Sequence, residues 1–377
     1  MMKKIICLVL LSAAAAVVTG CGGKSEAVEN SGVTIVKIMK PGSISDFYDV
    51  LSDFTEENPD IRVKFVDAPT GTLERHGLYV SAMAGRDSSV DIYWLNDEWT
   101  DEFAKYGYIR PFESDFEISH EQNITDTKNA FEYENRLYAM PIGVDTDVLY
   151  YRNDMVASTP QDWNTPINEN SISIDCRDGA DMIYNIIGIK RSMKVSFAET
   201  LKMYKRLIDG MDIENGDAAA VFKNGKKAMY FGKASDYGGM NSSVSAIRGR
   251  FSIAPIPEDK AAGYFVRSYG LGINSNSENT DAALKVIDYL KSEDVQRLLA
   301  RSCSLMPVIR SLYDDEMVLY DNAHFKNLKN IAETADSYAS LGVDNERIVR
   351  LSDALNMYLA GNINEETAGA VFEEELN

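Results

Sequence analysis

Acidic, amide and aromatic side chains gather where one predicted strand of the chain ends. At the end of the apolar run 90–95 and directly after it stand Trp94, Asn96, Asp97, Glu98 and Trp99. Carboxylates and amides form paired hydrogen bonds with hydroxyl groups, and aromatic rings offer flat stacking surfaces. Ligands of open α/β sheets bind beyond the C-terminal ends of the strands. These residues are therefore candidates for binding a small polar solute; the alternative places Trp94 in a core and Glu98 at a helix start.

Other polar and aromatic residues stand near further predicted strands. They are Pro41, Ser43, Asp145, Tyr237, Arg267 and Tyr269. Asp145 precedes the apolar run 148–151, where a turn residue is the alternative interpretation. A plain strand-to-helix turn explains Pro41 and Ser43 equally well. The chain has 20 tyrosines, most of which are expected to pack in cores, so abundance alone does not single out a tyrosine.

The sequence carries no catalytic motif. It contains no G-x-S-x-G elbow, H-E-x-x-H pair, P-loop or dinucleotide fingerprint. Asp145 and Asp147 could suggest a glycosidase pair, but carboxylates two strand positions apart are readily explained as neighbours. Residues 212–217 differ from a calcium loop in their ligand spacing and in the terminal Glu. We therefore expect a binding protein without a cofactor or metal rather than an enzyme.

Histidine and cysteine residues add no further site. The three histidines are isolated from one another, and no group of residues has the spacing of zinc ligands. Cys176 and Cys303 are the two cysteines outside the N-terminal segment. They could form a disulfide in an exporting compartment, or stay as two buried thiols.

Composition describes an acidic, water-soluble globular chain. Its 377 residues suggest two domains, at roughly 150 residues each. Hydrophobic residues make up 45% and charged residues 25%, a balance that excludes a wholly disordered chain and a multi-span membrane protein. The formal charge is −20. Because an acidic surface repels phosphate backbones, nucleic acid is not expected as a partner.

The N-terminus has the pattern of a bacterial lipoprotein signal. Lys3 and Lys4 precede an apolar stretch over residues 5–18 that is too short for a convincing membrane span. Val-Thr-Gly-Cys at residues 18–21 resembles a lipobox, in which cleavage leaves Cys21 as a lipid-modified N-terminus. An ordinary signal peptide with a chance cysteine is the alternative.

We therefore expect residues 1–20 to be a signal peptide and residues 21–32, which are small and polar, to be a flexible tether. An acylated cysteine carries enough lipid for stable anchoring. The protein is then exported and held at the cell membrane, on its extracellular face or periplasmic side.

The first third of the mature chain alternates between strand and helix patterns. Strands are predicted at residues 33–39, 61–66 and 90–95, and helices around 47–54, 73–84 and 98–106. This spacing is typical of right-handed βαβ units, so we expect an α/β domain with a mainly parallel sheet.

A second α/β pattern begins near residue 147. Strands are predicted at 148–151, 228–231 and 251–254, and helices at 178–187, 196–208 and 218–225. The run 269–274 reads as a buried strand that returns to the first domain, with a helix after it from residue 280. Further helices are predicted at 323–337, 345–359 and 365–376.

Five segments in the same order resemble one protein family. They are the helix-to-strand element 54–63, the strand and helix 91–112, the crossover 138–153, the F-x-x-G-K-x-A-M-x-x-G segment 222–232 and the A-to-P element 282–307. Together they are similar to the extracellular solute-binding proteins of bacterial ABC importers, the carbohydrate-type family that includes maltose-binding protein. One departure concerns residues 232–237, where the family often places an aromatic ligand platform and this chain has no Trp. Either Tyr237 substitutes for it, or the ligand differs.

The resemblance implies an α/β fold of two lobes, the type II periplasmic-binding-protein-like fold, with hinge crossovers and a helical C-terminal region. The first lobe would comprise residues 33–142 and 266–308, and the second residues 143–265 and 309–377. The ligand would lie in the cleft between the lobes. Trp94 and Asp97 match the family's aromatic and acidic ligand-binding positions, and Asp145 matches an acidic residue that faces the sugar.

The function that the resemblance implies is capture of a carbohydrate, expected to be an oligosaccharide, for delivery to an ABC permease. We expect a monomer that binds a small molecule, the permease subunits and, through its lipid, the membrane. One alternative keeps this role for a polyamine or another small cation, which the acidic residues allow. The other is a surface lipoprotein that binds a glycan or protein without transport.

Overall fold

The structure, a computed structural model, describes residues 32–113, 116, 123–124, 127, 129–163, 171–176, 178–209, 217–257 and 264–376. The predicted signal peptide, Cys21 and residues 21–31 of the predicted tether lie outside the described residues, as does most of the segment 212–217. No helix in the described part of the chain combines the length and apolar character that a membrane crossing needs. Cys176 and Cys303, both described, are not joined by a disulfide.

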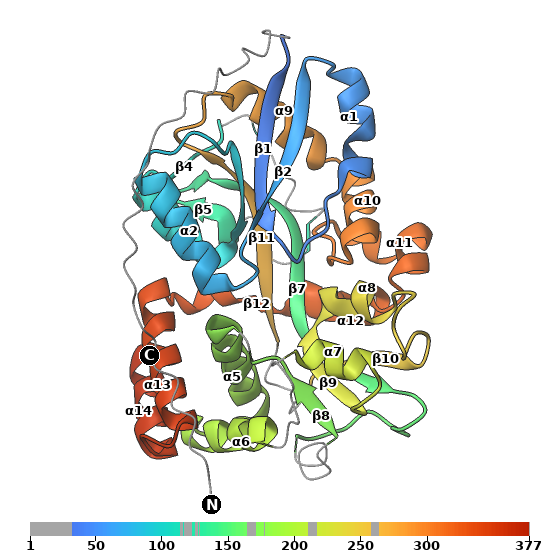
Figure 1. Cartoon of the computed structure of the whole chain (residues 1–377), viewed down its shortest axis with the longest axis vertical. Helices are drawn as coiled ribbons and strands as arrows, with labels where there is room; N and C mark the ends of the chain where they lie inside the picture. Colours follow the sequence, from blue (N-terminus) through green and yellow to red (C-terminus); the bar gives the residue numbers. More distant parts are fainter. Residues whose placement is uncertain are drawn as a thin grey trace, which may run out of the picture.

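Three parallel strands form the sheet of the first lobe, as their alternation with helices predicts. They are β1 (Thr34–Pro41), β2 (Ile61–Ala68) and β3 (Ile92–Asn96), in the order β2-β1-β3. Helices η1 (Tyr48–Leu51) and α1 (Ser52–Glu57) connect β1 to β2, and α2 (Thr72–Ala84) connects β2 to β3. Because parallel strands end at the same edge, this order brings the residues after all three strands toward the second lobe (Figure 1).

Two long strands continue the sheet and run through both lobes (Figure 1). β11 (Phe265–Asn274) pairs antiparallel with β3 on one side and with β7 (Ala139–Arg152) on the other. The predicted strand 148–151 is therefore only the end of β7. Pro141, Gly143 and two aspartates interrupt the apolar pattern of the remainder, and pairing with β11 rather than apolar alternation keeps that part extended. These antiparallel pairs make the sheet mixed rather than mainly parallel.

The sheet of the second lobe is built on the C-terminal part of β7. Its strands are β8 (Ile172–Ile174), β9 (Met229–Lys233) and β10 (Phe251–Pro255), and β9 and β10 both pair antiparallel with β7. Its helices in this part of the chain are α5 (Gly179–Met193), α6 (Phe197–Asp209), α7 (Ala218–Lys223) and, after the single turn η4 (Ala234–Asp236), α8 (Tyr237–Met240).

The remaining elements cover the sheet and its ends. The first lobe contains η2 (Asp97–Trp99), α3 (Thr100–Lys105), β4 (Ile109–Arg110), η3 (Asn129–Phe131), β5 (Glu132–Tyr133), β6 (Arg136–Leu137), α9 (Thr280–Leu290) and α10 (Glu293–Cys303). The C-terminal region comprises η5 (Arg310–Tyr313), α11 (Glu316–Asp321), α12 (Phe325–Thr334), β12 (Asp336–Ser337), η6 (Tyr338–Leu341), α13 (Asn345–Leu359) and α14 (Glu365–Leu376).

The predicted helix 323–337 is wrong at its C-terminal end. α12 ends at Thr334, and Ala335 has an extended backbone. Asp336 and Ser337 then pair in parallel with Phe265 and Val266 of β11. The free edge of β11 at this point accounts for the extended segment, because a strand edge offers backbone hydrogen bonds that a helix end does not satisfy.

Separate hydrophobic cores confirm the two-lobe α/β fold. One core lies among β1, β2, β3, α2, α3 and α9 in the first lobe. A second core lies beneath α5, α6, α13 and α14, and a third beneath α7 and α12. Polar residues of β7 and β11 lie between these cores, at the point where the chain crosses from lobe to lobe.

Candidate functional site

The crossover strands bring two of the predicted site residues side by side. Asp145 of β7 and Arg267 of β11 are partners in the antiparallel register, and Tyr269 stands two residues further along β11. Asp145 is 3% exposed and Arg267 is 4% exposed. Burying two ionisable groups is costly unless they are hydrogen-bonded, so their partners define what this place can do.

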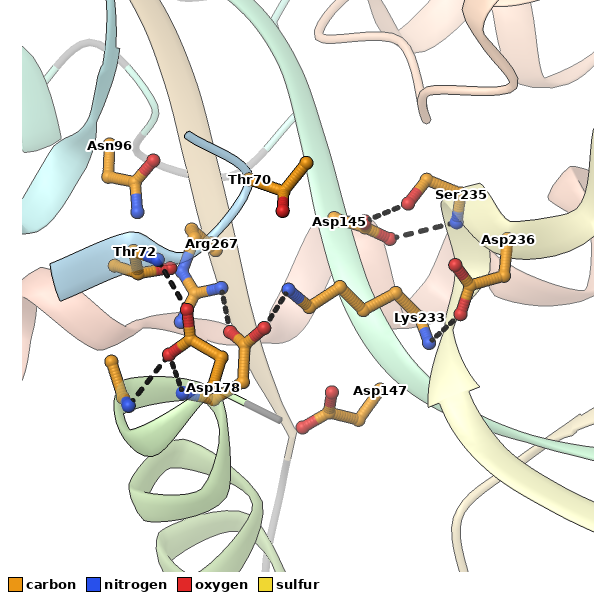
Figure 2. A network of polar contacts seen from close by, with 12 residues as sticks. Thr70, Thr72, Asn96, Asp145, Asp147, Asp178, Lys233, Ser235, Asp236 and Arg267 are labelled. Atoms are coloured by element: carbon orange, nitrogen blue, oxygen red, sulfur yellow. Dashed lines mark hydrogen bonds and ion pairs between the residues drawn. The ribbon is translucent and has the colours of Figure 1, made fainter. Parts of the chain in front are cut away.

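Asp145 connects the crossover to the second lobe. Its Oδ1 accepts a hydrogen bond from the backbone N–H of Ser235 at 3.1 Å, and its Oδ2 accepts one from the Ser235 hydroxyl at 2.5 Å (Figure 2). Burial raises the pKa of Asp145 to about 6, although the Ser235 hydroxyl acts in the opposite direction. Ser235 belongs to η4, the turn that follows β9.

Arg267 connects the lobes to each other. Its Nη1 donates to Asp181 of α5 at 3.0 Å, and its Nε lies 3.4 Å from Oε1 of Glu98 in the first lobe. The other carboxylate oxygen of Asp181 accepts from Nζ of Lys233 at 2.7 Å (Figure 2). Burial alone would raise the pKa of Asp181, but Lys233 and Arg267 hold it below its usual value. We call the alternating chain Glu98–Arg267–Asp181–Lys233 the ion chain.

Asp97 and Glu98 place the first lobe against the C-terminal region. Asp97 accepts a hydrogen bond from the hydroxyl of Ser337, which β12 holds next to β11. Burial and the neighbouring Glu98 raise the pKa of Asp97 well above its usual value. Asn96 donates to Oε1 of Glu98 at 3.0 Å and accepts from Arg75 at 3.2 Å. Asn96, Asp97 and Glu98 thus stand together at the end of β3, as the sequence pattern predicts.

Two cavities meet at the Glu98–Arg267 ion pair. The first, which we call the junction, has a volume of only about 10 Å³ and is lined by Asp145, Thr146, Asp147, Asp181, Tyr184, Asn185, Lys233, Arg267, Tyr269 and Tyr338. A volume of this size holds about one water molecule. Three tyrosine rings and several hydrogen-bonding groups therefore face one another with almost no space between them.

The second cavity, the acidic cavity, has a volume of about 820 Å³ and lies between the first lobe and the C-terminal region. Eight carboxylates line it, from Asp97, Glu98, Asp101, Glu102, Glu132, Glu333, Asp336 and Asp344. Several of these are paired: Glu333 with Arg310 at 2.9 Å, and Asp336 with Arg191 at 2.5 Å. The ion pairs reduce the charge that this cavity can offer to a cation.

The remaining predicted site residues lie elsewhere. Trp94 and Trp99 are 1% and 2% exposed in the core of the first lobe, and neither is among the described residues that line the two cavities. Both rings pack in that core, and the Trp94 ring also lies against Tyr269 of the junction lining, with ring centroids 6.0 Å apart. Pro41 is the buried last residue of β1, and Ser43 is exposed in the turn after it.

Tyr237 starts α8 and faces away from the junction lining. Its ring stacks on His324 with ring centroids 4.1 Å apart. It also lines a third cavity of about 460 Å³ together with Arg301 and Asp321. Tyr237 is thus not among the residues that line the junction, where Tyr184, Tyr269 and Tyr338 supply the rings.

Sequence reasoning missed Asp181, Tyr184, Lys233 and Tyr338. Asp181 and Tyr184 lie in the first turns of a helix that was correctly predicted, and the strand β8 before that helix was not recognised. A search for charged residues directly after each predicted strand would have found Lys233. Tyr338 directly follows the helix predicted over 323–337 and starts η6, so the prediction treated it as the residue after a helix end.

No group of His, Cys, Asp and Glu side chains in the described residues is arranged to hold a metal ion. What the junction can do is form hydrogen bonds from the second lobe and from the two crossover strands to one small polar molecule. Two α/β lobes, joined by crossover strands with polar groups buried between them, define the class of two-lobe binding proteins.

The chain belongs to the bacterial extracellular solute-binding protein family, whose model matches residues 41–297. Among solved structures, it is similar to maltose-bound MalE3 of T. maritima, with a TM-score of 0.78, 21% identity, and coverage of 91% of this chain and 98% of that one. It is also similar to the GacH receptor of Streptomyces glaucescens, solved unliganded and with acarbose, with a TM-score of 0.76, 19% identity, and coverage of 91% and 98%.

A third similar structure is a solute-binding protein of Agrobacterium vitis with bound D-mannitol. Its TM-score is 0.72 and its identity 17%, over 90% of this chain and 97% of that chain. At these identities the likeness concerns the fold.

Proposed function

We propose that this protein is the substrate-binding component of an ABC importer and that it captures a carbohydrate, expected to be an oligosaccharide, at the junction. The observation that carries the proposal is the convergence of both crossover strands and second-lobe residues around Asp145, Arg267 and Tyr269, with Glu98 of the first lobe 3.4 Å from Arg267. Carboxylates, a guanidinium and tyrosine rings are the groups that bind hydroxyls and flat sugar faces. The similar structures named above, described with maltose, acarbose and mannitol, support this ligand class.

A solute reaches the junction only when the lobes separate, because the closed junction holds about 10 Å³. Hydroxyl groups of the solute would then bond to Asp145 and Arg267, and the Tyr269 ring would pack against the solute. A ligand that contacts both lobes shifts an open–closed equilibrium by its difference in affinity for the two forms. The permease would recognise the liganded form.

A neutral solute fits the junction better than a polyamine does. Glu98 and Asp181 are already paired with Arg267 and Lys233, so these two carboxylates offer no free charge to a cation. The acidic cavity is the observation that favours the cationic alternative, since its lining has eight carboxylates against Arg310. A cation that binds there would be the second candidate ligand.

The cellular arrangement is also part of the proposal. Cleavage before Cys21 and lipid attachment would anchor an exported monomer to the membrane, with residues 21–32 as the tether. The lobes would comprise residues 33–142 with 266–308, and 143–265 with 309–377. The protein would bind its solute without turnover. The second alternative, a surface lipoprotein without transport, would not change its lobe separation on binding.

Calorimetric titration with maltose, maltotriose, mannitol and spermidine tests the proposal. We expect a neutral sugar or polyol to bind and to change the radius of gyration in solution scattering. Tyr269→Ala should weaken that binding about fivefold, because a lost stacking contact costs about 1 kcal/mol. Tyr320→Ala, at a side chain that is 87% exposed on α11, is the matched control. Binding of spermidine alone would favour the cationic alternative, and no binding of any compound would refute the proposal.

A further inference from the structure

Positive charge gathers in one part of the second lobe, although the chain as a whole is acidic. Residues 217–257 contain six Lys and Arg against two Asp, whereas the formal charge of the chain is −20. Two of the six cations, Lys227 and Lys233, are half-buried, and Lys233 belongs to the ion chain. The other four stand at the end of α7 or in the loops beside it: Lys223, Lys226, Arg248 and Arg250.

Backbone hydrogen bonds hold these loops together. The N–H of Ala246 donates to the carbonyl oxygen of Lys223 at 3.1 Å. The N–H of Asn153, just beyond β7, donates to the carbonyl oxygen of Arg250 at 2.9 Å. The end of α7, the loop 241–250 and the end of β7 therefore form one surface. It lies on the side of the second lobe that is away from α13 and α14 (Figure 1).

The four cations are not neutralised by the protein. Lys226, Arg248 and Arg250 are exposed and Lys223 is half-buried. None of the four forms an ion pair with a carboxylate in the part of the chain that the structure describes. Asp154 lies near Arg250, but it is already paired with Arg152 at 2.5 Å. Because like charges that are held together repel one another, an anion that binds to this surface would stabilise it.

Exposed apolar side chains accompany the cations. Val244, in the loop 241–250, is 78% exposed, and Met155, in the turn after β7, is 57% exposed. This combination is typical of surfaces that bind anionic membranes, where cations attract the headgroups and apolar side chains enter the interfacial region. A soluble polyanion would use the cations alone. The apolar side chains therefore favour a lipid surface as the partner.

We propose that this surface, which we call the basic patch, docks the second lobe on anionic lipid headgroups; it comprises Lys223, Lys226, Arg248 and Arg250 with Val244 and Met155. The same lipid surface repels the rest of the acidic chain, so contact is confined to this side and orients the second lobe. The lipid anchor proposed above would hold the patch at a high local concentration of headgroups. The patch itself does not depend on that anchor, nor on the proposed solute.

Vesicle flotation of the chain from residue 22 tests the proposal. Residues 1–21 are left out because the apolar stretch 5–18 and an acylated Cys21 would bind lipid by themselves. The buried core residues lie within 36–372, so this chain keeps all three cores. We expect it to float with vesicles of phosphatidylglycerol and phosphatidylcholine, but not with phosphatidylcholine alone. Added salt should release it, because salt screens exposed charges.

Two charge variants locate the contact. Lys226→Gln with Arg248→Gln should weaken vesicle binding about 25-fold, since each cation near an anionic surface contributes about fivefold, or about 1 kcal/mol. Arg62→Gln with Lys64→Gln is the matched control, because both residues are exposed on β2 in the first lobe and the same charge is removed. The control should bind like the unmodified chain. An equal loss in both double variants would overturn the patch.

Val244→Ser separates a lipid surface from other anions. It should weaken vesicle binding about threefold, because part of an apolar side chain leaves water at the lipid interface. Binding of soluble polyphosphate should stay unchanged in this variant. Polyphosphate binding as tight as vesicle binding, with no effect of Val244→Ser on either, would identify a general polyanion site and overturn membrane docking. Absence of binding to the phosphatidylglycerol vesicles would overturn it too.

Sugar titration keeps this inference separate from the proposed function. Lys226→Gln with Arg248→Gln should leave the affinity for the tightest-binding sugar of the panel unchanged, because neither residue is among those that line the junction or the acidic cavity. A loss of sugar affinity would show that this variant disturbs the fold, and Val244→Ser then decides the test. If no compound of the panel binds, the proposed function fails, and flotation alone decides whether the basic patch binds lipid.

Discussion

Asp97 and Glu98 are adjacent in sequence, yet their surroundings shift the pKa values of their carboxyl groups in opposite directions. Burial and the negative charge of Glu98 raise the pKa of Asp97. Burial would raise the pKa of Glu98 too, but Arg267 lowers it below its usual value. The surroundings therefore favour the neutral form of Asp97 and the charged form of Glu98.

This division of roles predicts unequal effects of two amide substitutions. Asp97→Asn should change the free energy of unfolding by less than about 1 kcal/mol, because the surroundings of Asp97 favour its neutral form, which Asn resembles. Glu98→Gln should cost about 2 kcal/mol, because it removes the charge that faces the buried guanidinium of Arg267. Urea unfolding at pH 7 measures both. Equal losses in the two variants would contradict the opposite pKa shifts of the two carboxyl groups.

Asp147 predicts a pH dependence of stability. Burial raises the pKa of this carboxyl to about 6, from a model-compound value of 3.8. The folded state therefore binds more protons than the unfolded state between these values, and stability falls as pH rises through this window. From pH 5 to pH 7 the loss amounts to about 1 kcal/mol for this group.

Asp147→Asn should remove that loss, because the hydroxyl of Tyr338 can still donate to an amide oxygen at this position. The difference in unfolding free energy between pH 5 and pH 7 should become smaller by about 1 kcal/mol. Asp154→Asn, at an exposed aspartate just beyond the end of β7, serves as the control. The prediction fails if both variants keep the pH dependence of the unmodified chain.

The sequence predicted those parts of the fold that depend on local pattern. Apolar alternation located β1, β2 and β3, and helical periodicity located α13 and α14 to within a residue. It failed where a partner strand decides the conformation. Most of β7 contains polar and glycine residues that only its pairing with β11 keeps extended, and β12 is a strand only because the edge of β11 accepts it.

The candidate site also has one part that local sequence patterns predict and another part that they do not. Asn96, Asp97 and Glu98 follow a recognisable strand, so their clustering was predictable from the rule on strand ends. The positions of Asp181 and Lys233 depend on how α5 and β9 lie against β11, which no local pattern specifies. Trp94 is the opposite case. Its aromatic side chain near the end of β3 suggested ligand binding, but the ring is buried in the core of the first lobe.

Gly143 predicts a steric requirement at the crossover. A Cβ at this residue of β7 would lie 2.1 Å from Cδ2 of Leu305, well inside contact distance. Gly143→Ala should therefore destabilise the protein by about 2 kcal/mol through overpacking. Leu305→Ala alone should also destabilise it, because this side chain is buried in the first-lobe core.

The double variant distinguishes a clash from a backbone requirement. If the side chains of the two residues compete for one space, Gly143→Ala with Leu305→Ala should be more stable than the sum of the single effects predicts, by about 1 kcal/mol or more. Urea unfolding of the four proteins closes the cycle. Simple additivity would mean that Gly143 is required for its backbone conformation rather than for space.

His324 predicts how stability is lost in acid. Its side chain is buried against the Tyr237 ring, and burial lowers the pKa of the imidazole to about 3. The unfolded state, with a pKa of about 6.5, binds the proton first. Stability from this group is therefore complete above about pH 6.5 and is lost as pH falls toward 3.

Replacing His324 by Phe keeps a planar ring in contact with Tyr237 and removes the proton. We expect the loss of unfolding free energy between pH 7 and pH 4.5 to become smaller by about 2 kcal/mol in His324→Phe. His76→Phe is the comparison, because His76 is buried too but its Nε2 lies 2.8 Å from Oε2 of Glu102, so its substitution removes a hydrogen bond. An acid dependence in His324→Phe as steep as that of the unmodified chain would show that this histidine is accessible to protons in the folded state.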